Sequence, residues 1–316
     1  MSLVGIMKGR GPSGFGYDTT AAEVLAGMDL RGRTFLVTGV ASGLGGETLR
    51  SLCARGARVL GLARSQERAA AACALVRNPV AQGKSSEGEA LPIACDLAQP
   101  ASVRQAVSAV RRLGWPLDGI IANAGIMALP KLQRQFGYEL QFFTNHVGHH
   151  LLVTGLLDRL APRGRVVILS SAAHTAAPRT GIEFDNLSGA AGYAPWRAYG
   201  QSKLANILFA RQLATRLPQP GQTAHAVHPG VIATNLARHM SPALRMLFRV
   251  GGATFLKTVP QGTATQCYVA THEAPGKLRG EYFADCNVAT SSALARDSAL
   301  AARLWDKTEE ILGGLA

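Results

Sequence analysis

Disulfide patterns and long apolar runs are missing from this sequence. Its five cysteines form no CxxC pair and lie inside apolar or helical patterns, so neither a disulfide framework nor a zinc site is expected. A reducing compartment fits this usage, and we expect a cytoplasmic protein. No run reaches the roughly 18 apolar residues of a membrane span, and the start of the chain is too weakly apolar for a signal peptide. Stable membrane insertion is therefore not expected.

Acidic and aromatic residues are scarce. The chain has 20 Asp and Glu against 33 Lys and Arg, a net charge of +13, and only 6% aromatic residues. A basic balance can indicate a nucleic-acid binder. Here the arginines are scattered singly with few aromatics among them, so we expect no nucleic-acid partner and favour phosphate-bearing small molecules. The basic amphipathic stretch 241–258 fits a lid over a pocket better than a helix on a membrane surface, and both readings remain open.

Short β-branched runs alternate with longer helical patterns from residue 33 onward. The runs are 33–39, 57–63, 90–96, 117–125, 164–171, 223–230 and 281–286, and the helical patterns lie near 44–55, 65–77, 101–113, 134–160, 198–217 and 260–272. This alternation is typical of βαβ units. It predicts an α/β protein with a single doubly wound parallel sheet of about seven strands and helices on both faces, a Rossmann fold.

No linker rich in Pro, Gly or Ser divides this series. We therefore expect one domain over 29–316, with a substrate loop or lid near 236–260. The Gly-rich residues 1–28 are expected to form a flexible N-terminal arm. Ligands of such a sheet bind beyond the carboxyl ends of its strands.

A glycine loop follows the first run. In "TGVASGLGG" the glycines Gly39, Gly43 and Gly45 stand between a strand and a helix. Glycine lets the backbone turn sharply and approach a pyrophosphate, and the helix N-terminus favours its negative charge. A plain Gly-rich turn would have the same composition, but the βαβ context favours a dinucleotide.

The end of the second run indicates which dinucleotide binds. An acidic residue there would hold the ribose 2′-hydroxyl of NAD, but no Asp or Glu occurs from Ala57 through Gln66. Arg64 stands at the tip instead, and its guanidinium suits a 2′-phosphate, with Ser42 and Ser65 as further donors. NADP(H) is therefore the preferred cofactor, and NAD(H) remains an alternative.

Tyr199 and Lys203 are four residues apart at the head of an apolar helical pattern. This spacing places a phenol and an ammonium on one face of a helix. A free phenol titrates near pH 10, so acid-base work near neutrality calls for a pKa lowered by roughly 2 to 3 units. An adjacent ammonium acts in that direction. The spacing alone also fits surface decoration.

Seven motifs in order resemble the short-chain dehydrogenase/reductase family. They are "TGVASGLG" (38–45), "CDL" (95–97), "NAG" (123–125), "NHVGHHLL" (145–152), "VVILSS" (166–171), "YGQSK" (199–203) and "HPGVIATNL" (228–236). The residues within these motifs are most similar to those of the branch that contains retinol dehydrogenases and WW-domain oxidoreductases. The resemblance implies hydride transfer between a nicotinamide cofactor and a small lipophilic alcohol or carbonyl substrate.

The resemblance also implies roles for four residues. Tyr199 would be the general acid/base and Lys203 its electrostatic helper. Ser171 would hydrogen-bond the reacting oxygen, and Asn145 would hold a water that links Lys203 to solvent. Ser170 competes with Ser171 for its role, and we choose Ser171 because family members usually place the active serine last in the strand.

The cofactor-binding residues implied by the resemblance surround these four. They are Gly39, Ser42, Gly43, Leu44, Gly45, Arg64, Asp96, Leu97, Asn123, Ala124, Gly125, Tyr199, Lys203, Pro229, Gly230 and Thr234. Within this set Asp96 would contact the adenine and Asn123 the ribose, while Pro229, Gly230 and Thr234 would hold the nicotinamide carboxamide. Asp96 also suits a helix cap after its strand.

Two further features of the sequence, a group of histidines and an aromatic loop, have more than one interpretation. His146, His149 and His150 share one helical side, but no acidic or cysteine ligand accompanies them, so no metal is expected. The loop 181–196 carries Phe184, Tyr193 and Trp196, which line the substrate pocket or form the loop's own small core.

The helical pattern 198–217 is apolar on more than one side, which predicts a homodimer or homotetramer. A non-catalytic NADPH-binding regulator or scaffold is the alternative to an enzyme. A nucleotide-sugar epimerase is disfavoured because its glycine spacing is not present.

Overall fold

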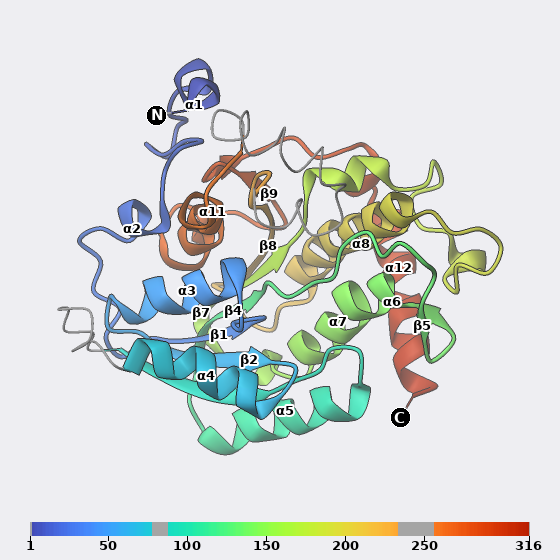
Figure 1. The fold of residues 1–316 in the computed structure, drawn as a ribbon, viewed down its shortest axis with the longest axis horizontal. Coiled ribbons are helices and arrows are strands. Elements are labelled where there is room, and N and C mark those ends of the chain that lie inside the picture. The colour runs from blue at the N-terminus through green and yellow to red at the C-terminus, as the bar shows by residue number, and fades with distance from the viewer. Residues whose placement is uncertain (1, 78–87, 233–255, 316) are drawn as a thin grey trace.

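One mixed β-sheet, with strands from most of the length of the chain, organises the fold. The computed structural model describes residues 2–77, 88–232 and 256–315 (Figure 1). The sheet contains eight strands in the order β10-β9-β8-β7-β4-β1-β2-β3. Their bounds are β1 Thr34–Thr38, β2 Arg58–Ala63, β3 Glu89–Ala94, β4 Leu117–Ala122, β7 Leu160–Leu169, β8 Thr223–His228, β9 Tyr282–Ala284 and β10 Asn287–Val288. Each of the seven predicted runs overlaps one strand of this sheet, which confirms the doubly wound fold, and β10 is a strand that was not predicted.

The strand order reverses beside β1. From β1 the chain moves outward through β2 to β3, and it then returns to the other side of β1 for β4, β7 and β8. These strands pair in parallel, and β10 alone runs antiparallel, against β9. A crevice opens at such a reversal, between the carboxyl ends of β1 and β4, and ligands of open α/β sheets bind there.

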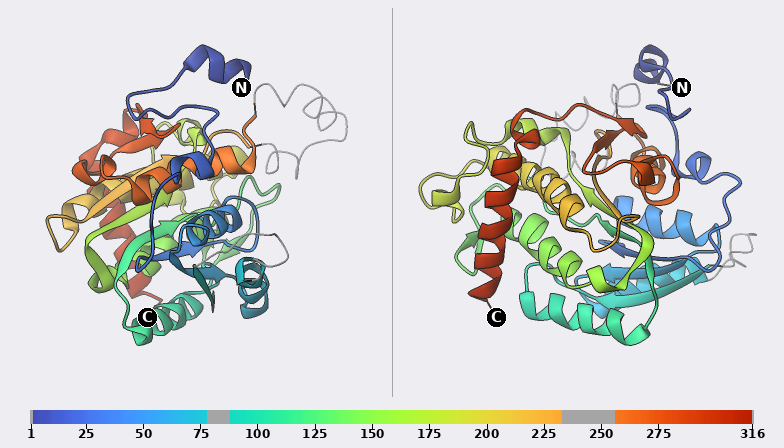
Figure 2. Two further views of the ribbon diagram at one scale, coloured as in Figure 1. Left: turned by 90° about the vertical axis from the view of Figure 1, so that its left-hand side faces the viewer. Right: turned by 180° about the vertical axis from the view of Figure 1, so that it is seen from behind.

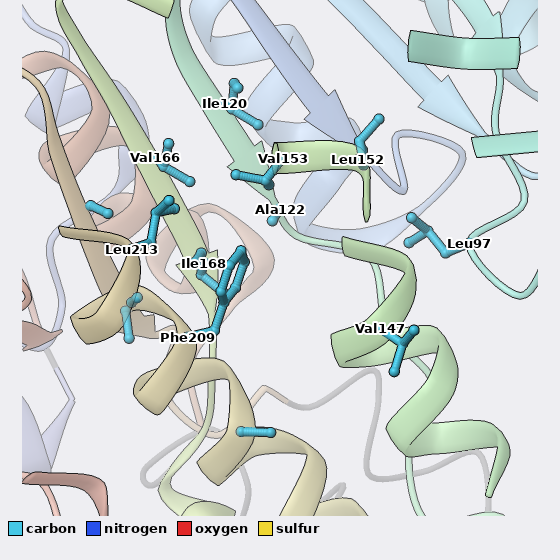
Figure 3. Close-up of a cluster of buried hydrophobic side chains, with 14 of the residues drawn as sticks. Leu97, Ile120, Ala122, Val147, Leu152, Val153, Val166, Ile168, Phe209 and Leu213 are labelled. Carbon is cyan, nitrogen blue, oxygen red and sulfur yellow. The ribbon is translucent and has the colours of Figure 1, made fainter. Parts of the chain in front are cut away.

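Helices cover both faces of the sheet. Their bounds are α1 Leu3–Lys8, α2 Ala21–Val24, α3 Gly43–Cys53, α4 Gln66–Arg77, α5 Pro100–Leu113, α6 Leu140–Phe142, α7 Gly148–Thr154, α8 Pro195–Arg216, α11 Val259–Thr271 and α12 Ser298–Gly313. Apolar residues of α5, α7, α8 and α12 form one core cluster, and those of α2, α3, α4 and α11 form a second. Figure 3 shows part of the first, where Ile120 of β4 and Ile168 of β7 lie with Leu152 of α7 and Phe209 of α8.

The helix predicted over 134–160 is divided in the structure. Residues Arg134–Gln135 (β5) and Tyr138–Glu139 (β6) pair as a small hairpin, with Gly137 at φ 84° in its turn. The helical backbone begins at Leu140, passes through a π-helical turn at Phe143–Val147, and ends at Thr154. The prediction of one helix was wrong because the periodicity of 140–154 was extended over a hairpin and a final 3-10 turn. π-helical turns inside α-helices frequently occur at functional sites.

The last helix, α12, is an element that the sequence analysis missed. It packs along α8, and Figure 2 shows it in red beside α8 in the view from behind. Leu204, Ile207, Leu208, Phe209 and Leu213 of α8 are all at most 2% exposed within one chain. The second apolar face of α8, from which we expected a partner subunit, is therefore covered by the chain's own C-terminal helix.

The N-terminal segment lies across α11, as the left view of Figure 2 shows. Its helix α2 begins with a capping box between Thr20 and Glu23, and Ala21, Val24 and Leu25 are buried in the second core cluster. Closer to the start of the chain, Lys8 forms an ion pair with Asp285 at 3.1 Å. The expected looseness of this arm stays a prediction, and the structure shows the surface on which it docks.

Candidate active site

Three elements bring the predicted catalytic side chains together. Tyr199 and Lys203 lie in the first turns of α8, Ser171 follows β7, and Asn145 lies in the π-helical turn before α7. α8 begins with Pro195 at its first position, where the missing N–H costs nothing and the fixed φ suits a helix. Tyr199 is therefore presented within two turns of a well-defined helix start.

The Tyr199 phenol is 9% exposed and shares a hydrogen bond with the Ser171 side chain. Burial raises the pKa of this phenol to about 12, and the hydrogen bond with Ser171 opposes the rise. This differs from the lowered pKa that we expected from the neighbouring ammonium. The physical reason is that removing the phenolate from water costs more than the contact with Ser171 returns.

Lys203 lies behind the Tyr199 ring, with Nζ 5.6 Å from the ring centroid. The side chain is 3% exposed, and burial lowers the pKa of its ammonium to about 8. Nζ donates to the carbonyl oxygen of Leu169, the last residue of β7, at 3.0 Å. An ammonium has three donors, and within the described residues Leu169 is the one hydrogen-bond acceptor that Lys203 reaches. The other N–H groups are available to a ligand such as a ribose.

The Asn145 side chain is fully buried, and its polar atoms hydrogen-bond other residues of the protein. Its Oδ1 accepts from the Ile126 amide at 2.8 Å, and its Nδ2 donates to the Ile126 carbonyl at 2.9 Å and to Ser202 Oγ at 3.0 Å. Ser202 Oγ in turn donates to the Tyr199 carbonyl at 2.7 Å. Asn145 therefore ties the loop after β4 to the helix that carries Tyr199. The expected water between Asn145 and Lys203 stays a prediction.

The two candidate serines after β7 have different partners. Ser170 Oγ is buried and donates to the Lys203 carbonyl at 2.7 Å. Ser171 Oγ accepts from the Ala173 amide at 3.1 Å and shares the hydrogen bond with Tyr199. Ser171 is the serine that the structure brings to the phenol, while Ser170 fixes the backbone of α8.

The glycine loop joins β1 to α3 at the strand-order reversal. Gly39 has φ 76° and Gly43 has φ 56°, a region that favours glycine. A Cβ on Gly45 would lie 2.3 Å from the Gly39 carbonyl oxygen, so the third glycine is needed for the close approach of helix and strand. Ser42 precedes α3 and makes no side-chain cap. The first amides of α3 are thus free of a side-chain cap, and the loop fits a pyrophosphate.

The expected adenosine contacts lie at the ends of β2 and β3. Arg64 is exposed and follows β2 directly, and the Gly39 amide donates to the Leu62 carbonyl at 2.8 Å, so the tip of β2 adjoins the glycine loop. Asp96 Oδ1 accepts from the Ala98 amide at 3.0 Å within the loop before α5. The N-cap of α5 is Gln99, without a side-chain cap, so Asp96 does not cap this helix. Leu44 and Leu97 are buried.

The "NAG" residues lie at the end of β4. The Asn123 side chain donates to the Thr38 carbonyl at 2.8 Å, so it joins β1 to β4. The amide of Ala124 donates to Thr38 Oγ1 at 2.9 Å. A Cβ on Gly125 would lie 3.1 Å from Asn145 Oδ1 and 3.5 Å from Lys203 Nζ. Glycine at 125 therefore leaves room for these two side chains next to the loop.

The segment after β8 contains a lysine that the sequence analysis did not single out. Gly230 has φ 87°, and a Cβ there would lie 2.6 Å from Lys257 Cδ. Lys257 Nζ pairs with Asp285 Oδ1 at 2.7 Å, with its side chain fully buried. Nothing in the spacing of these residues predicts the pair. Pro229 is buried before Gly230. Thr234 lies outside the described residues, and so do residues 236–255 of the lid expected near 236–260 and residues 241–255 of the amphipathic stretch 241–258.

The three aromatics of the 181–196 loop have different surroundings. Tyr193 donates to the Leu129 carbonyl at 2.6 Å, and Phe184 lies under the Arg303 guanidinium at 4.1 Å from the ring centroid. Both contacts join the loop to other parts of the chain, Tyr193 to the segment after β4 and Phe184 to α12. Trp196 is 52% exposed, and its ring meets the Tyr199 ring edge-on at a centroid distance of 6.1 Å. Trp196 is therefore the aromatic residue that borders the Tyr199 site.

The three histidines near Asn145 do not converge on one point. His146 hydrogen-bonds Thr308 Oγ1 at 2.9 Å, and His150 pairs with Glu309 at 2.5 Å, both on α12. His149 hydrogen-bonds Thr38 Oγ1 at 2.9 Å in the opposite direction, on β1. Across residues 2–77, 88–232 and 256–315, no group of His, Cys, Asp and Glu is arranged to hold a metal ion.

Comparison with known sequences identifies a family. The family model of the short chain dehydrogenases matches residues 33–245. The chain is 38% identical to the chloroplastic short-chain dehydrogenase TIC 32 A of Brassica napus, with all of both chains covered. It is 37% identical to human retinol dehydrogenase 14, covering 90% of this chain and 87% of the relative.

These relatives correct one expectation. Two relatives that align over the whole chain, both from Brassica napus, are chloroplastic proteins. The expectation of a cytoplasmic protein is therefore wrong on this comparison. In the part of the chain that the structure describes, no helix combines the length and apolarity of a membrane span.

Solved structures show the same fold. The crystal structure of an uncharacterised protein from Mycobacterium paratuberculosis matches with a TM-score of 0.71 and 30% identity, over 93% of this chain and 97% of that one. A blue fluorescent protein from a metagenomic library, in complex with NADPH, matches with a TM-score of 0.61 and 26% identity, over 81% of this chain and 97% of that one.

Proposed function

The chain belongs to the short-chain dehydrogenase/reductase family, in its retinol dehydrogenase branch, and from this premise we propose that it interconverts a lipophilic alcohol and its carbonyl compound with NADP(H). Tyr199 is the general acid/base of this proposal. The observation that carries it is the convergence of three side chains: Ser171 acts on the pKa of the Tyr199 phenol, and the buried Lys203 Nζ lies 5.6 Å from the centroid of the Tyr199 ring.

The four side chains divide the work in this proposal. A nicotinamide, when bound, would supply the hydride for reduction of a carbonyl and would accept it in the oxidation of an alcohol. Ser171 donates a hydrogen bond to the substrate oxygen, and Tyr199 transfers a proton to that oxygen when a carbonyl is reduced and removes it when an alcohol is oxidised. A phenol with a pKa raised to about 12 stays protonated near neutrality, which is the form that reduction requires. Lys203 orients the ribose with its remaining N–H groups and adds positive charge beside the phenol.

NADP(H) is favoured over NAD(H) by the tip of β2. Arg64 is an exposed guanidinium where an acidic residue would hold the ribose of NAD, and it suits the 2′-phosphate through two charge-assisted hydrogen bonds. The solved relative that contains NADPH supports this choice. The glycine loop and the cap-free start of α3 would hold the pyrophosphate between the two nucleotides.

The substrate class is argued from Trp196 and from the relatives. A Trp that is half exposed beside the acid/base residue offers a flat apolar surface to an entering molecule. The relatives named retinol dehydrogenases support a lipophilic alcohol or aldehyde. We therefore expect chains or rings of carbon next to the reacting oxygen, in preference to sugars.

Assay of purified protein tests the function. A panel of aliphatic, aromatic, terpenoid, steroid and retinoid alcohols and carbonyls would be followed by NADP(H) absorbance. We expect turnover of at least one lipophilic class and none with sugars. Tight NADPH binding with no turnover in any class would replace this proposal with a non-catalytic regulator or scaffold.

Three features of the whole chain stay predictions. They are the single domain over 29–316 with a lid near 236–260, the loose arm over 1–28, and a homodimer or homotetramer. Because α12 covers the α8 face that suggested a partner, any subunit interface must use another surface. Light scattering at micromolar concentration measures the mass, and a monomer would contradict the oligomer.

A further inference from the structure

His149 is a fully buried side chain to which the proposed reaction assigns no role. It lies in α7, one turn after Asn145, and its ring reaches β1 on the other side. Nδ1 lies 3.0 Å from the Asn145 carbonyl oxygen, and Nε2 lies 2.9 Å from Thr38 Oγ1. One imidazole therefore touches both the element that carries Asn145 and the strand that leads into the glycine loop.

The partners of His149 decide which nitrogen holds the proton. A carbonyl oxygen only accepts, so Nδ1 must donate to Asn145. Thr38 Oγ1 already accepts from the amides of Asn123 and Ala124, each at 2.9 Å, so its own proton is free to be donated to Nε2. Both partners demand the same neutral tautomer, with the proton on Nδ1. Burial lowers the pKa of His149 to about 4, which keeps the ring neutral near pH 7.

These contacts close a ring of hydrogen bonds around the loop after β4. The Ala124 amide donates to Thr38, Thr38 to His149, and His149 to the Asn145 carbonyl. The Asn145 side chain then returns to the same loop through both polar backbone groups of Ile126. Residues 124–126, which face the proposed cofactor crevice, are thereby held from two sides, and His149 is the member that joins the sides.

We propose that His149 is a positioning residue, which sets the cofactor-facing loop 123–126 and the Asn145 turn in register with Tyr199 and Lys203. This inference rests on the proposed function. Asn145 is tied through Ser202 to the Tyr199 backbone, so a displaced turn also displaces the acid/base residue. A misplacement of about 1 Å can cost about 100-fold in rate.

Two substitutions at 149 and one at 146 test the proposal. His149→Leu removes both hydrogen bonds, whereas His149→Gln keeps one donor and one acceptor. His146→Leu is the matched control, because His146 is equally buried on the preceding turn but bonds Thr308 of α12. We expect His149→Leu to lower kcat by about 10- to 100-fold and to weaken NADPH binding, measured by fluorescence titration. His149→Gln should recover most of both, and His146→Leu should lower Tm without changing either.

The tautomer gives a readout that needs neither substrate nor cofactor. In protein labelled with ¹⁵N-histidine, the ring nitrogen shifts of His149 should show Nδ1 protonated and Nε2 bare, the signals being assigned by their loss in His149→Gln. A proton on Nε2 would overturn the proposal. So would an equal loss of kcat in His146→Leu at the same drop in Tm, or an unchanged kcat and NADPH affinity in folded His149→Leu.

If His149→Leu does not fold, Thr38 provides the second test. Thr38→Val keeps the shape and removes the hydroxyl, while Thr38→Ser keeps the hydroxyl. We expect the valine variant alone to lose NADPH affinity and rate, and equal behaviour of the two would contradict the ring. If wild type turned over no carbonyl at all, the proposed function would fail, whereas the tautomer and the NADPH affinities would still decide the role of His149.

Discussion

The catalytic and the cofactor-facing parts of the candidate site differ in their access to water. Tyr199, Lys203 and Asn145 are 9%, 3% and 0% exposed, whereas Ser42 and Arg64 are exposed. Electrostatic contacts are strong and poorly screened in the buried part, and weaker and salt-dependent in the exposed part. Changes in the buried part should therefore cost rate, and changes in the exposed part should alter cofactor choice.

The largest effect is expected from removing the Tyr199 hydroxyl. Tyr199→Phe should lower kcat at least about 100-fold, the loss typical of a general acid/base group, with NADPH affinity nearly unchanged. Steady-state kinetics and a fluorescence titration measure the two quantities. Tyr193→Phe is the matched control, because its hydroxyl bonds the Leu129 backbone, so its rate should change little. Full activity of Tyr199→Phe would remove this residue from the mechanism.

A smaller loss is expected at Gly45, which is buried in the glycine loop that joins β1 to α3. Gly45→Ala would place Cβ 2.3 Å from the Gly39 carbonyl oxygen, so the backbone must move. Overpacking of this kind costs about 1 to 3 kcal/mol, and the loop should lose about 10- to 100-fold in NADPH affinity. Gly313→Ala in α12 is the control, since its Cβ would meet nothing within 4 Å. Unchanged affinity in Gly45→Ala would show that the glycine loop does not hold the pyrophosphate.

The charge on Lys203 predicts how the activity falls at alkaline pH. Burial lowers the pKa of Lys203 to about 8, so the folded protein loses this proton before the unfolded chain does. Activity that needs the cation, read as kcat/KM of reduction, should fall about tenfold for each pH unit above about 8. The unfolded chain binds more protons between pH 8 and the ordinary lysine pKa, so the Lys203 contribution to stability rises with pH in that window.

Deprotonation of Lys203 should therefore lower activity above pH 8 without destabilising the fold. Thermal unfolding, followed across the same pH range, separates this loss from denaturation. Lys203→Met should remove most of the activity, and the remaining activity should no longer fall above about pH 8. A flat profile up to pH 10 in wild type would contradict the role of the lysine cation.

The smallest effect is expected from the exposed arginine. Arg64→Asp should cost NADP about tenfold or more in affinity, since hydrogen bonds to charged groups contribute roughly 1.5 to 3 kcal/mol each. NAD should lose little, because a carboxylate can accept from both ribose hydroxyls. The ratio of kcat/KM for the two cofactors measures this at fixed ionic strength. An equal ratio in wild type and variant would refute the assignment of Arg64.

Much of the fold was predictable because short apolar runs between turn residues alternate with helical patterns along the chain. The glycine loop and the pair Tyr199 and Lys203 were predictable because their chemistry depends on spacing within one element. The helix α12 was missed altogether. The hairpin β5–β6 was predicted as helix because local periodicity does not distinguish a short strand pair from a helical turn. The family was identified from the motifs, whereas the location in the cell was not, since buried cysteines fit several compartments.

Local chemistry in the sequence thus predicted the doubly wound sheet, the place of the glycine loop and the candidate catalytic side chains. Only the tertiary structure decided which serine meets Tyr199, because Ser170 and Ser171 differ by the direction in which each points from the end of β7. It also decided that burial raises the Tyr199 pKa, and that His149 reaches Thr38, which lies 111 residues earlier in the sequence, and joins it to Asn145. Burial and long-range hydrogen bonds depend on which elements pack together, and no spacing within one segment contains that information.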